Sequence, residues 1–364
     1  MLENKAQELA QASASSSSGV KSHRNGNFFG LGFLAAIDAL LFEFGVAPEP
    51  VFRASGIREK DLKESNFKLP FAVASELLQK CAEASGRENF GLLLGQNMRL
   101  SDIGPLVLMV RSAATVRRVL ELMLEYLNLN TSAGNLKFEV KANNSILSFS
   151  IPEPGLPAEN QFYDMSMAFF TNTMRVLCGQ TFAASGVSLP RKMPINGADY
   201  KRTFNAPIRF GAMHASLVFS AHWLKLSPPT EGELLLGNVH SDADDEQHNR
   251  KLKLADRLPK ALKQGLLLDR FQAKDVANRL GMHERTLQRL LAKSDTTYRE
   301  ELDKVRFSLG KQMLKYSIMT ISEISTALGY SSSSAFIRAF ERWSGISPGA
   351  WRKVNSTGSG LGQK

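Results

Sequence analysis

A repeated pattern between Lys274 and Trp351 constrains the fold of this chain more than any other feature. The segments 276–291 (VANRLGMHERTLQRLL) and 321–340 (ISEISTALGYSSSSAFIRAF) each begin with a short amphipathic stretch, reach a glycine and continue into a second amphipathic stretch. The two glycines, Gly281 and Gly329, lie 48 positions apart. Glycine accepts the left-handed backbone that a tight turn between helices requires. The pattern therefore predicts two helix-turn-helix units.

The distribution of charge separates this region from the rest of the chain. A length of 364 residues predicts two domains with tails rather than one domain. Residues 250–353 hold 21 Lys and Arg against 10 Asp and Glu, so the whole excess behind the net charge of +10 belongs to the C-terminal third. Such an excess is typical of a domain that binds a polyanion, most often nucleic acid.

The composition indicates neither a membrane partner nor an oxidising compartment. No apolar run approaches the roughly 20 residues that cross a bilayer, and the Ser-rich start has no apolar signal-peptide core. A cytoplasmic location is therefore expected. Cys81 and Cys178 lie in apolar segments without CxxC spacing. This context predicts buried reduced thiols rather than a disulfide or a zinc site.

Residues 28–226 predict an α+β domain, with helices first and a small sheet afterwards. Apolar residues recur at helical spacing from Phe28 to about Leu129. The alternating segments 136–142 and 145–151 predict a β-hairpin that turns at Asn143-Asn144. The other expected elements are an apolar helix at 163–177 and short strands at 184–189, 208–210 and 216–219.

A search of this domain for catalytic or cofactor motifs gives a negative prediction. Gly30 to Ala35 matches GxGxxA but lacks the strand before it and the acidic strand end after it that a dinucleotide site requires. His214 and His222 have no nucleophile motif near them, and the chain has no P-loop or HExxH. Apolar residues at 162–178 could line a ligand pocket, but they are more typical of an ordinary core. We therefore expect a non-enzyme without a cofactor.

Polar segments define the expected domain boundaries. The Ser-rich residues 1–27 predict a disordered tail. Residues 227–249 contain six acidic residues and no Lys or Arg, which indicates an acidic linker. An all-α domain at 250–353 follows, in which a long helix joins the two helix-turn-helix units, and residues 354–364 predict a flexible tail.

The second helix of the first unit, expected at 283–293, has one face suited to DNA. Its buried side should contain Leu287, Leu290 and Leu291. The opposite face exposes Arg285, Gln288, Arg289 and Lys293. In the major groove, Arg can bond guanine in a bidentate manner and Gln can bond adenine, while other basic side chains contact phosphates. Alone, this face is equally compatible with a solvated basic helix.

The second unit favours DNA binding because it repeats the arrangement. Its second helix, expected at 333–343, buries Phe336, Phe340 and Trp343 and exposes Ser334, Ile337, Arg338 and Arg342, with Ser332 or Ser333 as its N-cap. A long helix at 298–316 would hold the two units at a fixed separation. Because successive major grooves on one side of DNA lie about 34 Å apart, a rigid spacer suits two reading helices. We therefore expect double-stranded DNA as the partner.

At these residues a family resemblance becomes specific. The segment 271–352 resembles the DNA-binding domain of AraC/XylS-type transcriptional regulators, above all through ALGY-x₄-AFIRAFERWSGISPGAWR at 327–352. GMHERTLQRLL in the first unit is similar to the first reading helix of that family. The N-terminal region resembles the arabinose-binding-like ligand and dimerisation domain of one subset. The resemblance implies a regulator, of activator type, that forms a homodimer and has a small effector and RNA polymerase as partners.

Carried over by position, the base-contacting sites of the family fall on Arg285, Gln288 and Arg289 and on Ser334, Ala335 and Arg338. The full set of expected DNA-binding residues is Arg285, Thr286, Gln288, Arg289, Lys293, Ser333, Ser334, Ala335, Arg338 and Arg342.

The sequence departs from the family pattern in three ways. His283 stands where a Ser N-cap is usual, Gly310 interrupts the long helix, and Ser334 and Ala335 replace longer polar side chains. We therefore expect the first unit to read bases and the second to contact mainly the DNA backbone. Two alternatives stay open: a DNA-binding protein that senses no ligand, and an enzyme with a DNA-binding appendage.

Overall fold

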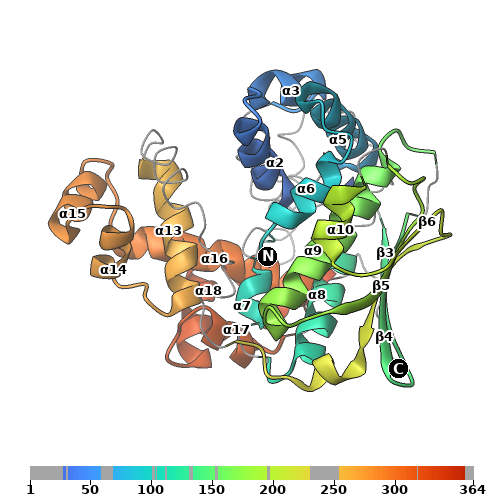
Figure 1. The fold of residues 1–364 in the computed structure, drawn as a ribbon. Coiled ribbons are helices and arrows are strands. Elements are labelled where there is room, and N and C mark those ends of the chain that lie inside the picture. Colours follow the sequence, from blue (N-terminus) through green and yellow to red (C-terminus); the bar gives the residue numbers. More distant parts are fainter. Residues whose placement is uncertain are drawn as a thin grey trace.

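The computed structural model consists of an N-terminal α+β part and a C-terminal helical part (Figure 1). It describes residues 28–29, 32–58, 69–100, 103, 105–110, 113–130, 134–151, 155–194, 197–229, 254–317 and 319–356. The predicted fold class is confirmed. The predicted tail at 1–27, nearly all of the acidic linker and most of the tail at 354–364 lie outside the described residues.

Helices form the first half of the N-terminal part. They are α2 (Gly32–Glu43), α3 (Pro48–Ala54), α5 (Phe71–Ser85), α6 (Phe90–Asn97), α7 (Leu106–Val110) and α8 (Val116–Asn130). A two-residue strand, β1 (Phe28–Phe29), precedes α2 and pairs antiparallel with β2 (Leu69–Pro70). The prediction that no strand precedes Gly30 is therefore wrong. A dinucleotide site needs a parallel strand–helix–strand unit, however, and β1 pairs antiparallel.

The sheet has five strands in the order β3-β4-β7-β5-β6. They are β3 (Asn135–Lys141), β4 (Asn144–Ser150), β7 (Ala215–Ser220), β5 (Ala184–Leu189) and β6 (Ile208–Phe210). Only β5 and β6 are parallel, and α10 (Ala198–Phe204) lies between them in the chain. Leu147 of β4 pairs with Leu217 of β7, and both side chains are buried. One face of the sheet therefore belongs to the core.

The hairpin turns one residue earlier than predicted. Lys141 pairs with Asn144, so the turn is Ala142-Asn143, with Ala142 at a φ of 51°. The sequence pattern pointed to Asn143-Asn144 because Asn tolerates this backbone better than Ala. Strand β4 also pairs with β7, and that ladder reaches Asn144 opposite Ser220. The second ladder thus keeps Asn144 in the strand and moves the turn.

Helix α9 (Glu159–Cys178) lies between the sheet and α6 and replaces the helix predicted at 163–177 with a longer one (Figure 1). Its backbone touches that of α6. A Cβ added at Gly91 would lie 2.2 Å from the carbonyl oxygen of Gln161, and one at Gly95 would lie 2.2 Å from that of Met165. Most apolar side chains of α9 are buried core residues, whereas Val176 and Cys178 are half-buried. Ordinary core is therefore the better interpretation of 162–178.

The C-terminal part contains two three-helix units and a final helix. The first unit is α13 (Leu254–Leu268), α14 (Ala273–Arg279) and α15 (Glu284–Ala292), and the second is α16 (Tyr298–Tyr316), α17 (Ile321–Ala327) and α18 (Ser333–Ser344). Helix α19 (Pro348–Ser356) follows. Pro259 lies inside α13. Both predicted helix-turn-helix units are present.

The two parts contact each other through α7 and α8. Helix α7 packs on α13 and α17, and α8 packs on α16. The rings of Tyr126 in α8 and Tyr316 in α16 meet edge to face, 6.3 Å apart at their centroids. None of the five residues of α7 is more than 5% exposed. The helical part is thus docked on the N-terminal part. Among the described residues, no helix combines the length and the apolar character that crossing a bilayer requires.

Candidate nucleic-acid interface

The turn of each helix-turn-helix unit is fixed in the same way. Gly281 and Gly329 have φ of 70° and 71°, the left-handed backbone that the sequence pattern predicted. In the first unit, Arg257 of α13 donates a hydrogen bond of 2.8 Å to the carbonyl oxygen of Leu280. In the second, Arg306 of α16 donates one of 2.9 Å to the carbonyl oxygen of Leu328. Each turn is therefore held by an arginine from the helix that precedes the helix-turn-helix pair, α13 in the first unit and α16 in the second.

Helix α15 begins with a histidine cap. The Nδ1 atom of His283 accepts a hydrogen bond of 3.2 Å from the backbone N–H of Arg285. The imidazole thus makes the contact that a Ser hydroxyl makes at an ordinary N-cap. Leu287 and Leu291 are buried as predicted, whereas Leu290 is only half-buried.

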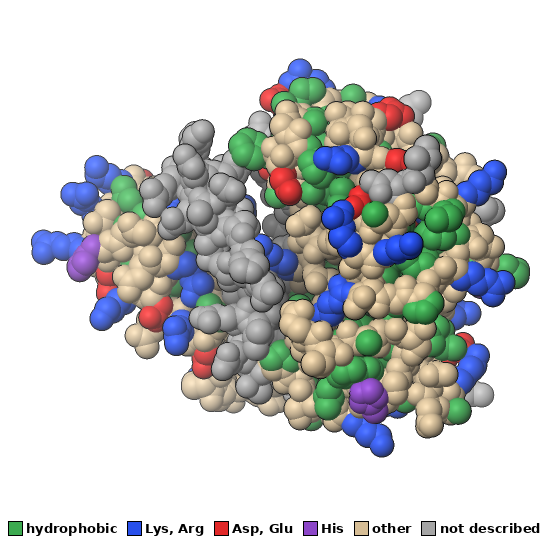
Figure 2. Space-filling view, in the orientation of Figure 1, with side chains coloured by type: hydrophobic (Ala, Val, Ile, Leu, Met, Phe, Trp, Pro, Cys, Tyr) green, Lys and Arg blue, Asp and Glu red, His purple; other side chains and the backbone are tan. Residues whose placement is uncertain are grey.

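The outward face of α15 is basic. Arg285, Gln288, Arg289 and Lys293 are exposed, and Thr286 is half-buried. Lys and Arg side chains gather at the end of the molecule that α14 and α15 form (Figure 2). The amide of Gln288 donates to Glu284 in a hydrogen bond of 3.1 Å. Because an amide nitrogen carries two hydrogens, this bond uses one donor of Gln288 and leaves the second.

The exposed face of α18 is less charged. Its N-cap is Ser332, whose hydroxyl accepts from the backbone N–H of Ala335 at 3.2 Å. Ser334 and Arg338 are exposed, while Ser333 and Ala335 are half-buried. The side chains of Ser333, Ser334 and Ala335 are short and reach less far from the helix than those of α15, whereas Arg338 is long.

Arg342, also predicted to contact DNA, has partners within the protein. Its guanidinium pairs with Asp303 of α16 at 3.1 Å and lies 5.7 Å from the ring centroid of Trp343. Trp343 is half-buried rather than fully buried as predicted. In this arrangement Arg342 joins α18 to the long helix.

Helix α16 is the predicted spacer, and it is continuous through Gly310. It begins with a capping box in which Thr297 and Glu300 bond each other's backbone N–H. A Cβ at Gly310 would lie 3.4 Å from Leu328 and 3.5 Å from Phe336. The glycine therefore does not end the helix, and a methyl group at this position would make ordinary contacts with α18 and the turn before it.

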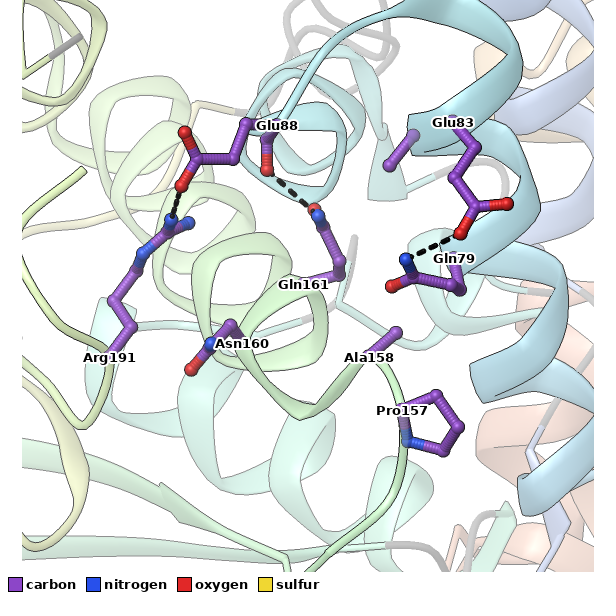
Figure 3. A pocket seen from close by; sticks show the side chains of 9 residues that line it. Gln79, Glu83, Glu88, Pro157, Ala158, Asn160, Gln161 and Arg191 are labelled. Carbon is purple, nitrogen blue, oxygen red and sulfur yellow. Dashed lines mark hydrogen bonds and ion pairs between the residues drawn. The ribbon is translucent and has the colours of Figure 1, made fainter. Parts of the chain in front are cut away.

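The N-terminal part holds a buried polar cluster that the sequence patterns did not reveal. Arg191 bonds Asp164 and the hydroxyl of Tyr200, and Tyr200 donates to Asp164 at 2.6 Å. Arg191 also pairs with Glu88 at 2.9 Å. Burial raises the pKa of Asp164 to about 6, although Arg191 and Tyr200 both act to lower it. Arg191 and Glu88 border a cavity of about 300 Å³ (Figure 3).

Other candidate chemistry in the N-terminal part is limited. Cys81 and Cys178 are free, and burial raises the pKa of each thiol to about 12. Cys81 is buried as predicted, whereas Cys178 is half-buried. The ring of His222 lies beside Ser220, with 2.9 Å between Nδ1 and Oγ. Within the described ranges, no group of His, Cys, Asp and Glu could hold a metal ion.

A double helix-turn-helix domain behind an α+β domain defines a class of DNA-binding transcriptional regulator. Residues 45–227 match the family described as the arabinose-binding domain of AraC transcription regulator, and residues 276–354 match a helix-turn-helix domain family. The chain belongs to the AraC family of transcriptional regulators.

Several relatives carry names of regulators. The regulator VirS of Mycobacterium tuberculosis is 26% identical over 316 residues, which cover 86% of this chain and 93% of that protein. The ornithine utilization regulator of Pseudomonas aeruginosa is 26% identical over 331 residues, or 88% of this chain and 95% of that one. The transcriptional activator RhaR of Escherichia coli is 32% identical over 130 residues, or 35% and 39%.

Proposed function

We propose that this chain activates transcription by binding paired DNA half-sites as a homodimer, under control of a small effector bound by residues 28–226. Residues 250–353 form the DNA-binding domain in this proposal. The observation that carries it is the exposed basic face of α15, joined through the long helix α16 to a second reading helix, α18. Two helices on one rigid spacer suit two successive major grooves.

In this proposal the first unit contacts the bases and the second contacts mainly the DNA backbone. Arg285, Gln288 and Arg289 of α15 have the length and donors to bond base edges. On α18, Ser333, Ser334 and Ala335 are short, which suits close approach to the DNA backbone, and Arg338 is placed for a phosphate. Thr286 and Lys293 complete the contacts of the first unit. Arg342 joins them through the guanidinium donors that Asp303 does not occupy.

The proposed control passes through the docking contacts. An effector shifts an equilibrium only by its difference in affinity for two arrangements. The contacts of α7 and α8 with α13, α16 and α17 provide an element whose arrangement both parts can bias. The cavity beside Arg191 supports effector sensing over a purely architectural role. Activation is supported by the name of RhaR, and RNA polymerase is the partner that activation requires.

The test begins with selection of double-stranded sequences from a random pool by the purified full-length protein. We expect one enriched motif made of two half-sites, with a binding constant that falls steeply as salt rises. Sedimentation at the same concentrations should find two chains per motif. Enrichment of no sequence, or equal binding to the motif and to its scrambled version, would contradict the proposal.

A further inference from the structure

We propose that the cavity between α5 and the start of α9 binds a small organic cation that carries amino groups. This inference rests on the proposed function, because it names the effector class that the N-terminal part senses. The cavity measures about 300 Å³ and is lined chiefly by Gln79, Glu83, Glu88, Asn160, Gln161 and Arg191. This volume is at the lower end of ligand pockets, so the occupant is small.

The single basic residue that lines the cavity is already neutralised. The Arg191 side chain is only 6% exposed, and its NH1 atom bonds Asp164 and Tyr200. Its NH2 atom pairs with Glu88 at 2.9 Å, and its Nε atom donates to the carbonyl oxygen of Lys192 at 3.3 Å. Most of the guanidinium donors are therefore occupied, and little positive charge is left to attract an anion.

Two of the three side-chain amides that line the cavity, those of Gln161 and Gln79, are also engaged. Gln161 accepts from the backbone N–H of Gly91 at 2.6 Å and donates to the carbonyl oxygen of Glu88 at 2.8 Å. Gln79 donates to one carboxylate oxygen of Glu83 at 2.7 Å. These bonds hold two walls of the cavity in place. Asn160 supplies the third amide, which can both donate to a ligand and accept from one.

What the lining does offer is carboxylate oxygen. Glu83 and Glu88 each have one oxygen that bonds no residue among those the structure describes. Carboxylates only accept hydrogen bonds when ionised, so the ligand must donate them. Two carboxylates and one arginine that is already paired are the charged groups lining the cavity, so a cation is favoured over an anion.

The position of the two carboxylates indicates more than one amino group. Figure 3 shows Glu83 with Gln79 on the α5 side of the cavity and Glu88 bonded to Arg191 on the other side. Asn160 and Gln161, in the first turn of α9, lie between the two sides in the same view. A short chain with an ammonium group at each end can therefore meet one carboxylate on each side.

Occupation of the cavity would reach the centre of the domain through Arg191. The Asp164 side chain is fully buried, and its Oδ1 atom has no hydrogen-bond partner. A ligand ammonium group that takes Glu88 from Arg191 frees the NH2 donor of an arginine whose NH1 atom bonds Asp164. An unpaired buried polar atom is costly, so a turn of this guanidinium toward Oδ1 would offset part of the lost ion pair. The hydrogen bonds between Arg191 and Asp164 of α9 then differ between the empty and the filled cavity.

The experiment is calorimetric titration of the full-length protein with 1,4-diaminobutane. We compare it with 1,4-butanediol, which has the same length without charge, and with succinate, which has the opposite charge. Glu83→Gln and Glu88→Gln remove the two carboxylates and keep the shape of the side chains. Glu76→Gln is the matched control, because Glu76 lies on α5, pairs with Lys80 at 2.6 Å and does not line the cavity.

We expect 1,4-diaminobutane to bind, and each of Glu83→Gln and Glu88→Gln to weaken the affinity at least about tenfold, the loss of one charge-assisted contact. Glu76→Gln should leave it unchanged. Binding of succinate in preference to the diamine, or diamine binding that survives the Glu83→Gln/Glu88→Gln double variant, would overturn the inference. Absence of diamine binding in a protein that still selects its DNA motif would also overturn it, while the proposed function would stand.

Discussion

The guanidinium of Arg306 lies over the ring of Tyr330, 4.5 Å from the ring centroid. The ring of Phe271, which precedes α14, lies 5.0 Å from the same guanidinium. Arg306 also donates to the carbonyl oxygens of Leu328 and Gly329, each at 2.9 Å. One side chain of the long helix thus joins the entrance of the first unit to the turn of the second. This junction fixes how the two reading helices stand relative to each other.

Replacement of Arg306 with Ala should destabilise the protein. Two hydrogen bonds from a charged donor and two cation–π contacts are lost, which together should lower the free energy of unfolding by about 2–4 kcal/mol. Urea titration followed by circular dichroism measures this change. Arg299→Ala is the control, because Arg299 is an exposed residue of the same helix, and its effect should stay within about 0.5 kcal/mol. Equal effects of the two variants would mean that the junction contributes nothing.

Two glycines near this junction should respond to Ala in opposite ways. At Gly310 the added methyl group meets Leu328 at 3.4 Å, an ordinary contact, so Gly310→Ala should stabilise α16 by about 0.5–1 kcal/mol. At Gly329 it would lie 2.7 Å from the Phe271 ring on a backbone with φ of 71°. Gly329→Ala should therefore lower the melting temperature, and Gly310→Ala should raise it. Differential scanning calorimetry of both variants checks the sign of each change, and a shift of the same sign in both would refute this account.

The unequal reading of DNA can be tested with one arginine from each unit. Arg289→Ala should weaken binding to the selected motif by about 1–3 kcal/mol and leave binding to scrambled DNA much less affected. Arg338→Ala should weaken both by similar amounts and reduce the slope of log K against log salt by about 1. Fluorescence anisotropy at several salt concentrations separates the two patterns. If the two variants exchange these patterns, α18 is the base reader.

The capping boxes of α16 and α17 should make stability sensitive to acid. A backbone N–H of Thr297 holds the pKa of Glu300 below its ordinary 4.5, and one of Thr320 does the same for Glu323. Because each pKa is lower in the folded than in the unfolded chain, this stabilisation is fully present above about pH 4.5. It is lost as the pH falls through the lowered values.

Melting temperatures measured from pH 6 to pH 3 test this expectation. A Glu300→Gln/Glu323→Gln variant keeps a capping side chain without a titrating group, so its melting temperature should fall less over this range. Replacement of Glu341, an exposed residue of α18 outside both capping boxes, with Gln is the control. The idea fails if the double variant follows the unmodified protein at every pH.

The elements of this fold were predictable where a local pattern determines them. The spacing around Gly281 and Gly329 predicts both helix-turn-helix units, because a left-handed residue between two amphipathic stretches leaves few other structures. The turn at Ala142 was not predictable from the local residues, since the ladder between β4 and β7 decides it. Gly91 and Gly95, four positions apart in α6, were an available signal of a close helix contact that the periodicity of apolar residues does not reveal.

The candidate sites also contain features that local patterns predict and features that only long-range contacts determine. The exposed face of α15 follows from helical periodicity alone, because its buried leucines fix which side chains point outward. The partners of Arg342 and Arg191 do not follow from helical periodicity. Asp303 lies 39 positions from Arg342, and Asp164 lies 27 positions from Arg191. Contacts over such separations depend on how helices pack, and the periodicity of a single sequence does not reveal them.

Helix α7 has no face in contact with water, and this limits how the two parts of the protein can move. Detaching the DNA-binding domain from α7 would expose aliphatic side chains that each cost about 1.5–3 kcal/mol to return to solvent. The binding free energy of a small ligand in a 300 Å³ cavity is too small to offset the cost of such a separation. Regulation through the contacts of α7 is therefore expected to be a rotation or a slide of packed helices that keeps α7 buried. The size of this movement would determine which spacings between DNA half-sites the protein can bind.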